Sequence, residues 1–279
     1  TDQTEKAVNL ILESIKLDWN LKDPKFYCNL ASIYQTFTDY DNALQYYSKA
    51  LILNPDHLLA LNRTNLLLYY LGEYEKAIPF ALKWHQNDPQ SYMPINFLGM
   101  HYSKLSQWKH SENTWRLMAE LETNLQPEAD SLQVYLPWRH RLAHALSQQG
   151  KTKEALEIAQ QDLELVTQNS LQYPTNIGQQ YALAAIQAFL GNQEAMFDAL
   201  ELSVHSYPFI PSYEILRVDP IFEPYHDLPR FKEIEKQYYE LRYSQETYLK
   251  MTVLREQMYK FESSLGKDIY RQLTHVAVL

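Results

Sequence analysis

The sequence predicts an all-α fold, an α-solenoid of stacked helical hairpins, from three observations. The first is a period of 34 residues, at which Ala43 is followed by Ala77 and Ser111. The second is that the same period relates Pro55 to Pro89, and proline ends helices. The third is the low glycine content, 6 of 279 residues or roughly 2% against an average near 7%, which disfavours folds built on tight β-turns. A period of this length is typical of repeat arrays.

The best-defined hairpin runs from Tyr27 to Pro55. Its characteristic residues are small or aromatic: Leu30, Ala31, Tyr34, Tyr40, Ala43, Tyr47 and Ala50. Two helix axes about 8–10 Å apart leave no space for a large side chain at the crossing, which explains the small residues. Pro55 ends the second helix because it lacks a donor and clashes with the preceding turn. The pattern resembles the tetratricopeptide repeat family, whose unit is two antiparallel helices with small residues where they cross.

Five such hairpins are predicted over residues 24–204. The period carries the first three, although the middle one has Thr64 and Asn65 where its neighbours have small or apolar residues. The fourth is marked by Leu142, Ala143, Gly150, Ala155 and Ala159. The fifth, the least regular, is marked by Leu183, Ala184, Gly191, Met196 and Ser203. A connection over residues 167–178 is expected between these last two hairpins.

Residues 1–23 are expected to form the second helix of a repeat whose first helix is missing from the sequence. Ala7, Ile11 and Ser14 keep the spacing found on the second helix of the best-defined hairpin. The sequence also lacks an initiator methionine. We therefore expect that it begins inside a longer protein, with more repeats or another domain upstream.

The C-terminal part is expected to contain a cap over residues 205–230 and a long helix with a tail over residues 231–279. The stretches 216–222 and 227–231 resemble the segment that closes tetratricopeptide arrays of bacterial signalling proteins, including nucleotide cyclases, protein kinases and transcriptional regulators. A terminal repeat needs such a cap because its last apolar face is otherwise exposed. Apolar spacing on the long helix leaves two alternatives open, packing back onto the array or a coiled-coil homodimer.

Composition disfavours several classes of partner. The net charge of -9 opposes binding to nucleic acid, which needs clustered lysine and arginine. Cys28 is the single cysteine, so an intramolecular disulfide is excluded. No stretch approaches 18 uninterrupted apolar residues, and the first residues do not form a signal peptide. A cytoplasmic protein without a membrane segment is expected.

No enzyme motif or cofactor site is predicted. His140 and His144 are four residues apart on one face of a predicted helix, as a zinc pair requires, but no third ligand and no neighbouring glutamate base accompany them. Groove polarity is the favoured interpretation of this pair. Nucleophile, phosphate-loop and kinase patterns are absent from the sequence. We therefore expect a non-catalytic protein with no cofactor and no metal.

The resemblance implies that the first helix of each hairpin lines a concave groove. The groove positions that match here are Asn62, Arg63, Asn96, His140, Arg141 and His144. Asparagine both donates to and accepts from a peptide backbone, and the alternative role of these residues is packing between repeats or exposed polarity. The Lys, Asn and Arg clamp with which related modules hold chaperone tails is absent, because Arg63 is the only basic residue at the corresponding positions.

Two functions follow from the expected groove. The first is a scaffold that binds a peptide or protein segment, because rigid stacked hairpins lower the cost of ordering an extended ligand. The alternative is a regulatory or oligomerisation segment of a larger bacterial signalling enzyme or transcriptional regulator. The two differ in what precedes the first residue.

Overall fold

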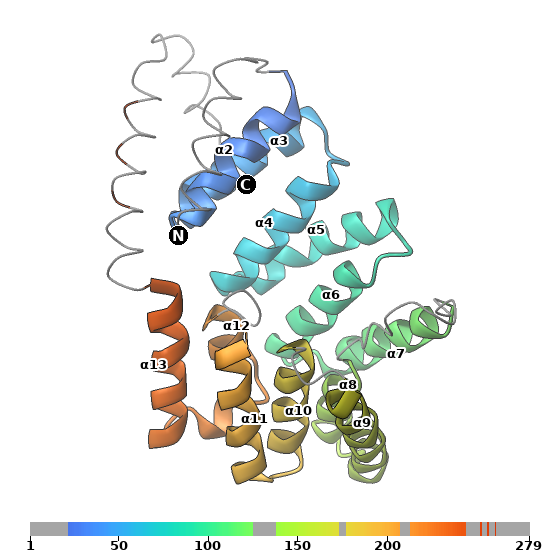
Figure 1. Cartoon of the computed structure of the whole chain (residues 1–279). Coiled ribbons are helices and arrows are strands. Elements are labelled where there is room, and N and C mark those ends of the chain that lie inside the picture. The colour runs from blue at the N-terminus through green and yellow to red at the C-terminus, as the bar shows by residue number, and fades with distance from the viewer. Residues whose placement is uncertain are drawn as a thin grey trace. The chain divides into compact units, whose positions relative to one another are not determined.

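A computed structural model describes residues 22–124, 138–172, 177–206 and 213–243, together with residues 252, 256 and 260. The predicted helix of residues 1–23 therefore lies almost entirely outside the described residues. Most of the predicted C-terminal helix and tail, beyond residue 243, lies outside them as well. All regular elements within the described residues are helices (Figure 1).

In the described residues of the repeat region ten helices follow one another, and their lengths match those of short hairpin arms. They are α2 (Pro24–Thr36), α3 (Tyr40–Leu53), α4 (Leu58–Tyr70), α5 (Tyr74–Asn87), α6 (Tyr92–Lys104), α7 (Trp108–Asn124), α8 (Arg139–Ser147), α9 (Thr152–Gln172), α10 (Ile177–Phe189) and α11 (Gln193–Ser206). The cap contains α12 (Tyr213–Val218) and a 3₁₀ turn, η1 (Glu223–Tyr225), and α13 (Pro229–Tyr243) follows it. The expected connection over residues 167–178 is wrong, because α9 continues to Gln172 and α10 begins at Ile177.

Consecutive helices pack as pairs in four of the hairpins that the structure describes, α2 on α3, α6 on α7, α8 on α9 and α10 on α11. The crossing positions that the period predicts are buried, among them Ala43, Ala77 and Ser111. Gly99 faces the indole of Trp115 so closely that a Cβ built there would lie 2.4 Å from two ring carbons. The small residues of the repeat are thus required by the close approach of the paired helices.

The turns inside the hairpins repeat the same backbone conformation. Thr38, Gly72 and Ser106 are each 34 residues apart, and their φ angles are 58°, 77° and 55°. Gly150 and Gly191 occupy the corresponding turns of the last two hairpins, also with positive φ. A left-handed residue directly after a helix lets the chain reverse within a few residues. Period and backbone therefore agree even where the residue is not glycine.

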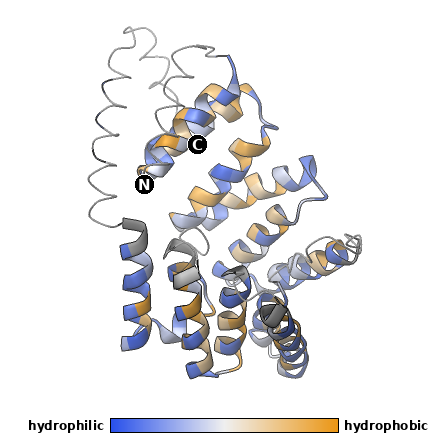
Figure 2. Cartoon of the chain, in the orientation of Figure 1, coloured by the Kyte–Doolittle hydropathy of each residue, from blue (hydrophilic) through white to orange (hydrophobic). Residues whose placement is uncertain are grey.

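The described chain divides into two compact units. The first contains residues 22–71 and 79–88, and the second contains residues 72–78 and 89–242. In the second unit the cap and α13 complete an apolar cluster with α10 and α11, in which Phe222, Phe231 and Phe197 are buried. Figure 2 shows that apolar and polar residues alternate around these helices, as amphipathic packing requires. Among the described helices none is long and apolar enough to cross a membrane.

Candidate functional site

In the first unit, two predicted groove residues lie on α4, the first helix of its hairpin. Asn62 and Arg63 are half-buried, and neither side chain makes a hydrogen bond or ion pair with another described residue. The hydroxyl of Tyr47 lies 3.1 Å from Ser32 Oγ and donates to Gln35 Oε1 at 3.0 Å. Burial raises the pKa of Tyr47 to about 12, while the bond to Ser32 and the charge of Arg63 act in the opposite direction. Asn62 and Arg63 are therefore partly exposed polar residues without a partner among the described residues, whereas the hydroxyl of the buried Tyr47 is satisfied inside the unit.

Asn96 lies on α6 in the second unit and is half-buried. Its side-chain amide points to the sulfur of Met100, 3.6 Å from Nδ2. Thioether sulfur is a weak acceptor, so this contact leaves most of the amide's hydrogen-bonding capacity unused.

His140 does not face a groove, because its side chain is fully buried between α8 and α9. Asp162 Oδ2 accepts a hydrogen bond from the His140 backbone at 3.0 Å and lies 3.4 Å from Nδ1 of the ring. The other ring nitrogen, Nε2, has no hydrogen-bond partner among the described residues. His140 thus joins the two helices of its hairpin.

Arg141 lies on α8 and points to the cap. Its Nη2 donates to Asp219 Oδ2 at 3.1 Å. The same carboxylate accepts from Tyr181 of α10 at 3.0 Å and from the backbone of Ile221 at 3.2 Å. Burial would raise the pKa of Asp219, but the charges of Arg141 and His140 and these hydrogen bonds lower it overall. Arg141 is therefore held by a residue 78 positions away.

His144 lies on the wall of a hollow of about 240 Å³. Helices α6, α7 and α8, the turns after α6 and α8, and the cap all contribute residues to its wall. The hollow is lined by Ser103, Lys104, Ser106, Trp108, His144, Gln148, Pro220, Glu223 and Pro224. The indole of Trp108 meets the imidazole edge-on, with ring centroids 5.5 Å apart. Burial lowers the pKa of His144, although Asp219 and Glu223 act against this shift, so the imidazole is neutral near pH 7.

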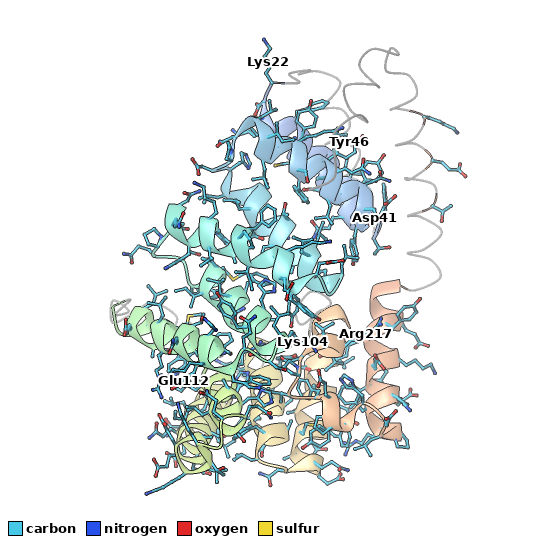
Figure 3. All side chains as sticks on the ribbon, turned by 180° about the vertical axis from the view of Figure 1, so that it is seen from behind. Lys22, Asp41, Tyr46, Lys104, Glu112 and Arg217 are labelled. Carbon is cyan, nitrogen blue, oxygen red and sulfur yellow. The ribbon has the colours of Figure 1, made fainter. Side chains whose placement is uncertain are left out.

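Lys104, at the end of α6, supplies the positive charge of this hollow. Its ammonium lies 2.7 Å from Glu223 Oε1 in the cap. The label in Figure 3 marks Lys104 on the second unit, seen from behind. Lys104, Asp219 and Glu223 were not predicted as site residues. The sequence motif around Asp219 indicates a cap, but no period relates it to α6 or α8.

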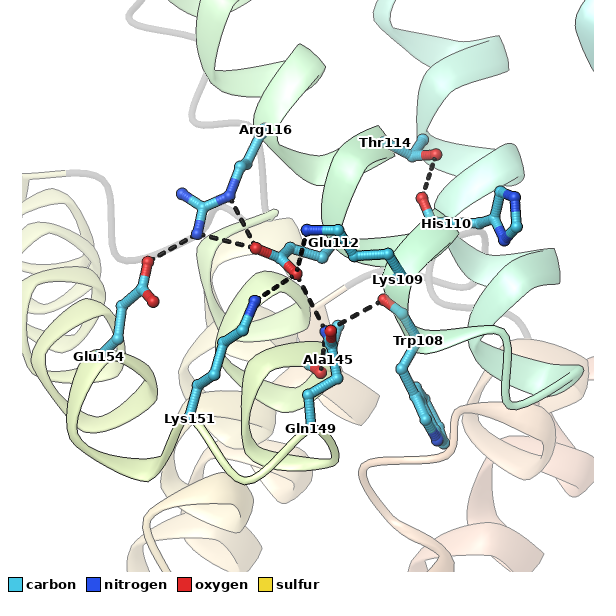
Figure 4. Close-up of polar contacts among 10 residues, drawn as sticks. All are labelled: Trp108, Lys109, His110, Glu112, Thr114, Arg116, Ala145, Gln149, Lys151 and Glu154. Atoms are coloured by element: carbon cyan, nitrogen blue, oxygen red, sulfur yellow. Dashed lines mark hydrogen bonds and ion pairs between the residues drawn. The ribbon is translucent and has the colours of Figure 1, made fainter.

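A second polar cluster joins the third and fourth hairpins through Glu112 of α7 (Figure 4). Its carboxylate is 3% exposed and accepts from Lys109, Arg116, Gln149 and Lys151 at 2.7–3.1 Å. Burial would raise the pKa of Glu112, but these four donors lower it to about 2. Lys109 and Arg116 come from α7, and Gln149 and Lys151 come from the turn after α8, so this cluster stabilises the stacking of the two hairpins.

The described residues contain no group of three His, Cys, Asp or Glu side chains that could hold a metal ion. His140 and His144 are on the same helix as predicted, but the first contacts Asp162 and the second contacts Trp108. The pair therefore does not converge on one point among these residues.

Comparison with known families gives two matches. The family model described as tetratricopeptide repeat matches residues 24–57 and residues 139–173. These are the first and the fourth predicted hairpins. A search of curated proteins finds no match.

Solved structures share the fold. A tetratricopeptide repeat protein from Parabacteroides merdae superimposes with a TM-score of 0.53 at 16% identity, covering 89% of this chain and 91% of that one. The APC/C hetero-tetramer Cut9–Hcn1 also gives 0.53, at 14% identity, covering 90% of this chain and 46% of that one. YrrB, described as a tetratricopeptide repeat protein with an unusual peptide-binding site, gives 0.43 at 20% identity, covering 72% and 93%.

The repeat matches and the helical hairpins agree on one family. Both matched segments begin at the first helix of a hairpin, α2 at Pro24 and α8 at Arg139. Repeats of this family are generally non-catalytic protein-interaction modules. This chain therefore contains tetratricopeptide repeats at residues 24–57 and 139–173.

Proposed function

We propose that the chain is a non-catalytic scaffold that binds an extended peptide or protein segment on the first helices of its hairpins. One observation carries the proposal: the side chains of Asn62 and Arg63 on α4 are half-buried, yet no described residue accepts their hydrogen bonds. Partly buried donors that are not used inside a protein are available to a ligand's carbonyl or carboxylate oxygens. The hydroxyl of the neighbouring Tyr47 already makes hydrogen bonds with Ser32 and Gln35, so it does not require a donor from Arg63.

The second unit supports a narrower set of binding residues than the sequence predicts. His140 is buried and Arg141 is bound to Asp219, so both act inside the chain. Asn96 and His144 keep hydrogen-bonding capacity, the first on α6 and the second in the hollow. We therefore keep Asn62, Arg63, Asn96 and His144 as ligand-contact residues and assign His140 and Arg141 a structural role.

The test uses peptides selected on the purified chain from a phage library of random dodecapeptides. Asn62→Ala combined with Arg63→Ala should weaken the binding of the selected peptides about tenfold or more, because each lost charged or neutral hydrogen bond is worth about 0.5–3 kcal/mol. Fluorescence polarisation with labelled peptides measures the loss. The double variant Asn62→Ala, Asn96→Ala tests the amides alone.

Asn113→Ala is the matched control, since Asn113 is exposed on α7, a second helix. It should leave peptide binding unchanged, and circular dichroism should show equal helicity in all variants. Unchanged binding by the folded Asn62→Ala, Arg63→Ala protein, or no recoverable peptide at all, overturns the proposal.

A second candidate function is a regulatory segment of a larger bacterial signalling enzyme or transcriptional regulator. It is supported by the C-terminal segment, in which Ile221, Phe222 and Phe231 pack against α10 and α11 as a cap. The sequence of the full-length gene product tests it. An upstream cyclase, kinase or DNA-binding domain would favour it, and a protein of repeats alone would exclude it.

The proposed homodimer through the C-terminal helix needs a separate test. In the described part of α13, Phe231, Ile234 and Tyr238 are buried against the chain's own helices, which supports packing back onto the array. Light scattering of the purified chain distinguishes the two alternatives, because a coiled-coil dimer doubles the mass. We also expect that the chain does not bind nucleic acid and that it is cytoplasmic. A direct binding assay and a direct localisation experiment test these two expectations.

A further inference from the structure

Within the second unit, the cap reaches back to the first helices of three successive hairpins. Its polar contacts to them include Glu223 to Lys104 of α6, Asp219 to Arg141 of α8, and Tyr225 Oη to the Ala188 carbonyl of α10. First helices are the face on which we propose ligand binding. Part of that face is therefore covered by the chain's own residues 219–225.

The two carboxylates of this segment are held very differently. Asp219 is 1% exposed and accepts hydrogen bonds from Arg141, Tyr181 and the Ile221 backbone. The Glu223 side chain is 56% exposed, and Lys104 is its one side-chain partner among the described residues. Breaking a buried, multiply bonded ion pair leaves uncompensated charge, whereas an exposed pair contributes little. Asp219 therefore holds the segment against the hairpins, whereas Glu223 can leave Lys104 at little cost in free energy.

The partner of Glu223 is less accessible than Glu223 itself. The Lys104 side chain is only 16% exposed and lies at the hollow of about 240 Å³ beside Trp108 and His144. The hollow thus combines a recessed ammonium, a neutral imidazole and an indole ring. An acidic side chain followed by an apolar one matches this combination of charge and aromatic surface.

We propose that Lys104 and this hollow bind an acidic side chain of a partner's protein segment, and that Glu223 is the chain's own occupant of the position until the partner displaces it. The inference rests on the proposed function of peptide binding and names the chemistry of the ligand. A basic partner residue would instead draw Glu223 away and leave the recessed Lys104 unpaired. An acidic residue leaves only the exposed Glu223 unpaired, and water solvates that carboxylate.

The experiment selects peptides from the random dodecapeptide library on the Glu223→Gln chain and measures their affinity for four proteins. These are the wild-type chain, Glu223→Gln, Lys104→Met, and the double variant. Selected peptides should contain Glu or Asp, and Glu223→Gln should bind them up to about fivefold more tightly than the wild type, which corresponds to about 1 kcal/mol. Adding Lys104→Met should lower the affinity at least tenfold, and peptides with Gln in place of Glu should show neither effect.

Two matched controls separate these effects from a change in net charge. Glu157→Gln and Lys153→Met alter an exposed ion pair on α9, distant in sequence from the cap, and should change affinity little. Melting temperatures establish that every variant is folded.

Four outcomes overturn the inference. They are equal binding of acidic peptides by Glu223→Gln and wild type, retained binding in the double variant, selection of basic peptides, and equal binding of the Glu and Gln peptides. Peptides whose binding depends on Arg63 but not on Lys104 overturn this inference and leave the proposed function standing. Failure to recover any peptide on either protein overturns both.

Discussion

Hairpin α2–α3 and hairpin α6–α7 solve the same packing problem with different residues. Two periods of 34 residues relate Ala31, Ala43 and Tyr47 of the first to Gly99, Ser111 and Trp115 of the second. Tyr47 and Trp115 are both fully buried where their helices cross. One hairpin therefore combines two alanines with a tyrosine, and the other combines glycine and serine with a tryptophan.

The larger ring explains both small residues in hairpin α6–α7. The indole lies where the Cβ of an alanine at position 99 would be. Its Nε1 donates to Ser111 Oγ at 3.0 Å, and Ser111 lies 2.8 Å from Ser103 Oγ. Tyr47 instead directs its hydroxyl to Ser32 and Gln35 on its partner helix. A repeat position thus specifies a volume shared by facing residues and a partner for any buried polar atom.

The two hairpins also differ in a charged residue at one repeat position. Leu44 on α3 corresponds to Glu112 on α7, where Lys109, Arg116 and Lys151 converge. A half-buried leucine of one hairpin thus corresponds to a buried ionic cluster at the same repeat position of the other. Hairpin α6–α7 should therefore respond to mutation and to acid in ways that hairpin α2–α3 does not.

The largest expected effect is that of Gly99→Ala. A new Cβ at 2.4 Å from the Trp115 ring forces the helices or the indole to move, and overpacking of this kind costs about 3 kcal/mol. Urea unfolding measures the loss. Adding Trp115→Tyr converts the pair into that of hairpin α2–α3 and should recover part of the stability. A double variant no more stable than Gly99→Ala would contradict the shared-volume explanation.

Glu112→Gln should lower stability by about 2–3 kcal/mol at pH 7, because hydrogen bonds to a buried charge are lost. In the wild type the pKa of Glu112 is about 2, below its unfolded value near 4.5, so its contribution is present above pH 4.5 and disappears as pH falls towards 2. The difference between the two proteins should therefore shrink in acid.

Unfolding curves at intervals from pH 7 to pH 3 measure this convergence. Burial also lowers the pKa of His101, to about 3, so both proteins lose stability as the pH falls below 6.5. This loss of stability is the same in both proteins and cancels in the difference between them. Glu157→Gln, on an exposed glutamate, is the control for the removal of one carboxylate. A constant gap between wild type and Glu112→Gln across this range would contradict the assigned pKa.

Ser111→Ala should destabilise the chain by about 1–2 kcal/mol. The substitution introduces the alanine found at position 43, but here it leaves the buried Trp115 N–H without an acceptor. Thermal unfolding measures the effect, and Thr114→Ala is the control, since its hydroxyl bond to the His110 carbonyl is exposed. If Ser111→Ala is as stable as Thr114→Ala, the indole does not need its partner.

The smallest effect is expected in the turns. Thr38→Gly should raise stability by about 1 kcal/mol, because a β-branched residue is strained at a φ of 58°. Ser106→Gly should raise it less, since serine is not β-branched. Calorimetric melting temperatures compare the two. A decrease in both would mean that the entropy of the unfolded glycine outweighs the strain.

Local features of this fold are readable from the sequence. The alanines at 43 and 77, the prolines at 55 and 89, and the recurring turn positions place hairpins correctly, because helix pairing depends on spacing and size over a few tens of residues. Asn62 and Arg63 lie half-buried on a first helix, in line with the predicted groove, but their role in binding stays a prediction.

The sequence by itself determined the repeat, the small residues at its crossings and the position of the cap. The tertiary structure alone decided which polar side chains are available, because it turns His140 towards Asp162 and brings Asp219 to Arg141 across 78 positions. The first contact depends on how α8 packs on α9 and the second on how the cap folds back onto α8, and the 34-residue period predicts neither of them. Burial then separates two carboxylates that look equivalent in the sequence, an anchored Asp219 and an exposed Glu223.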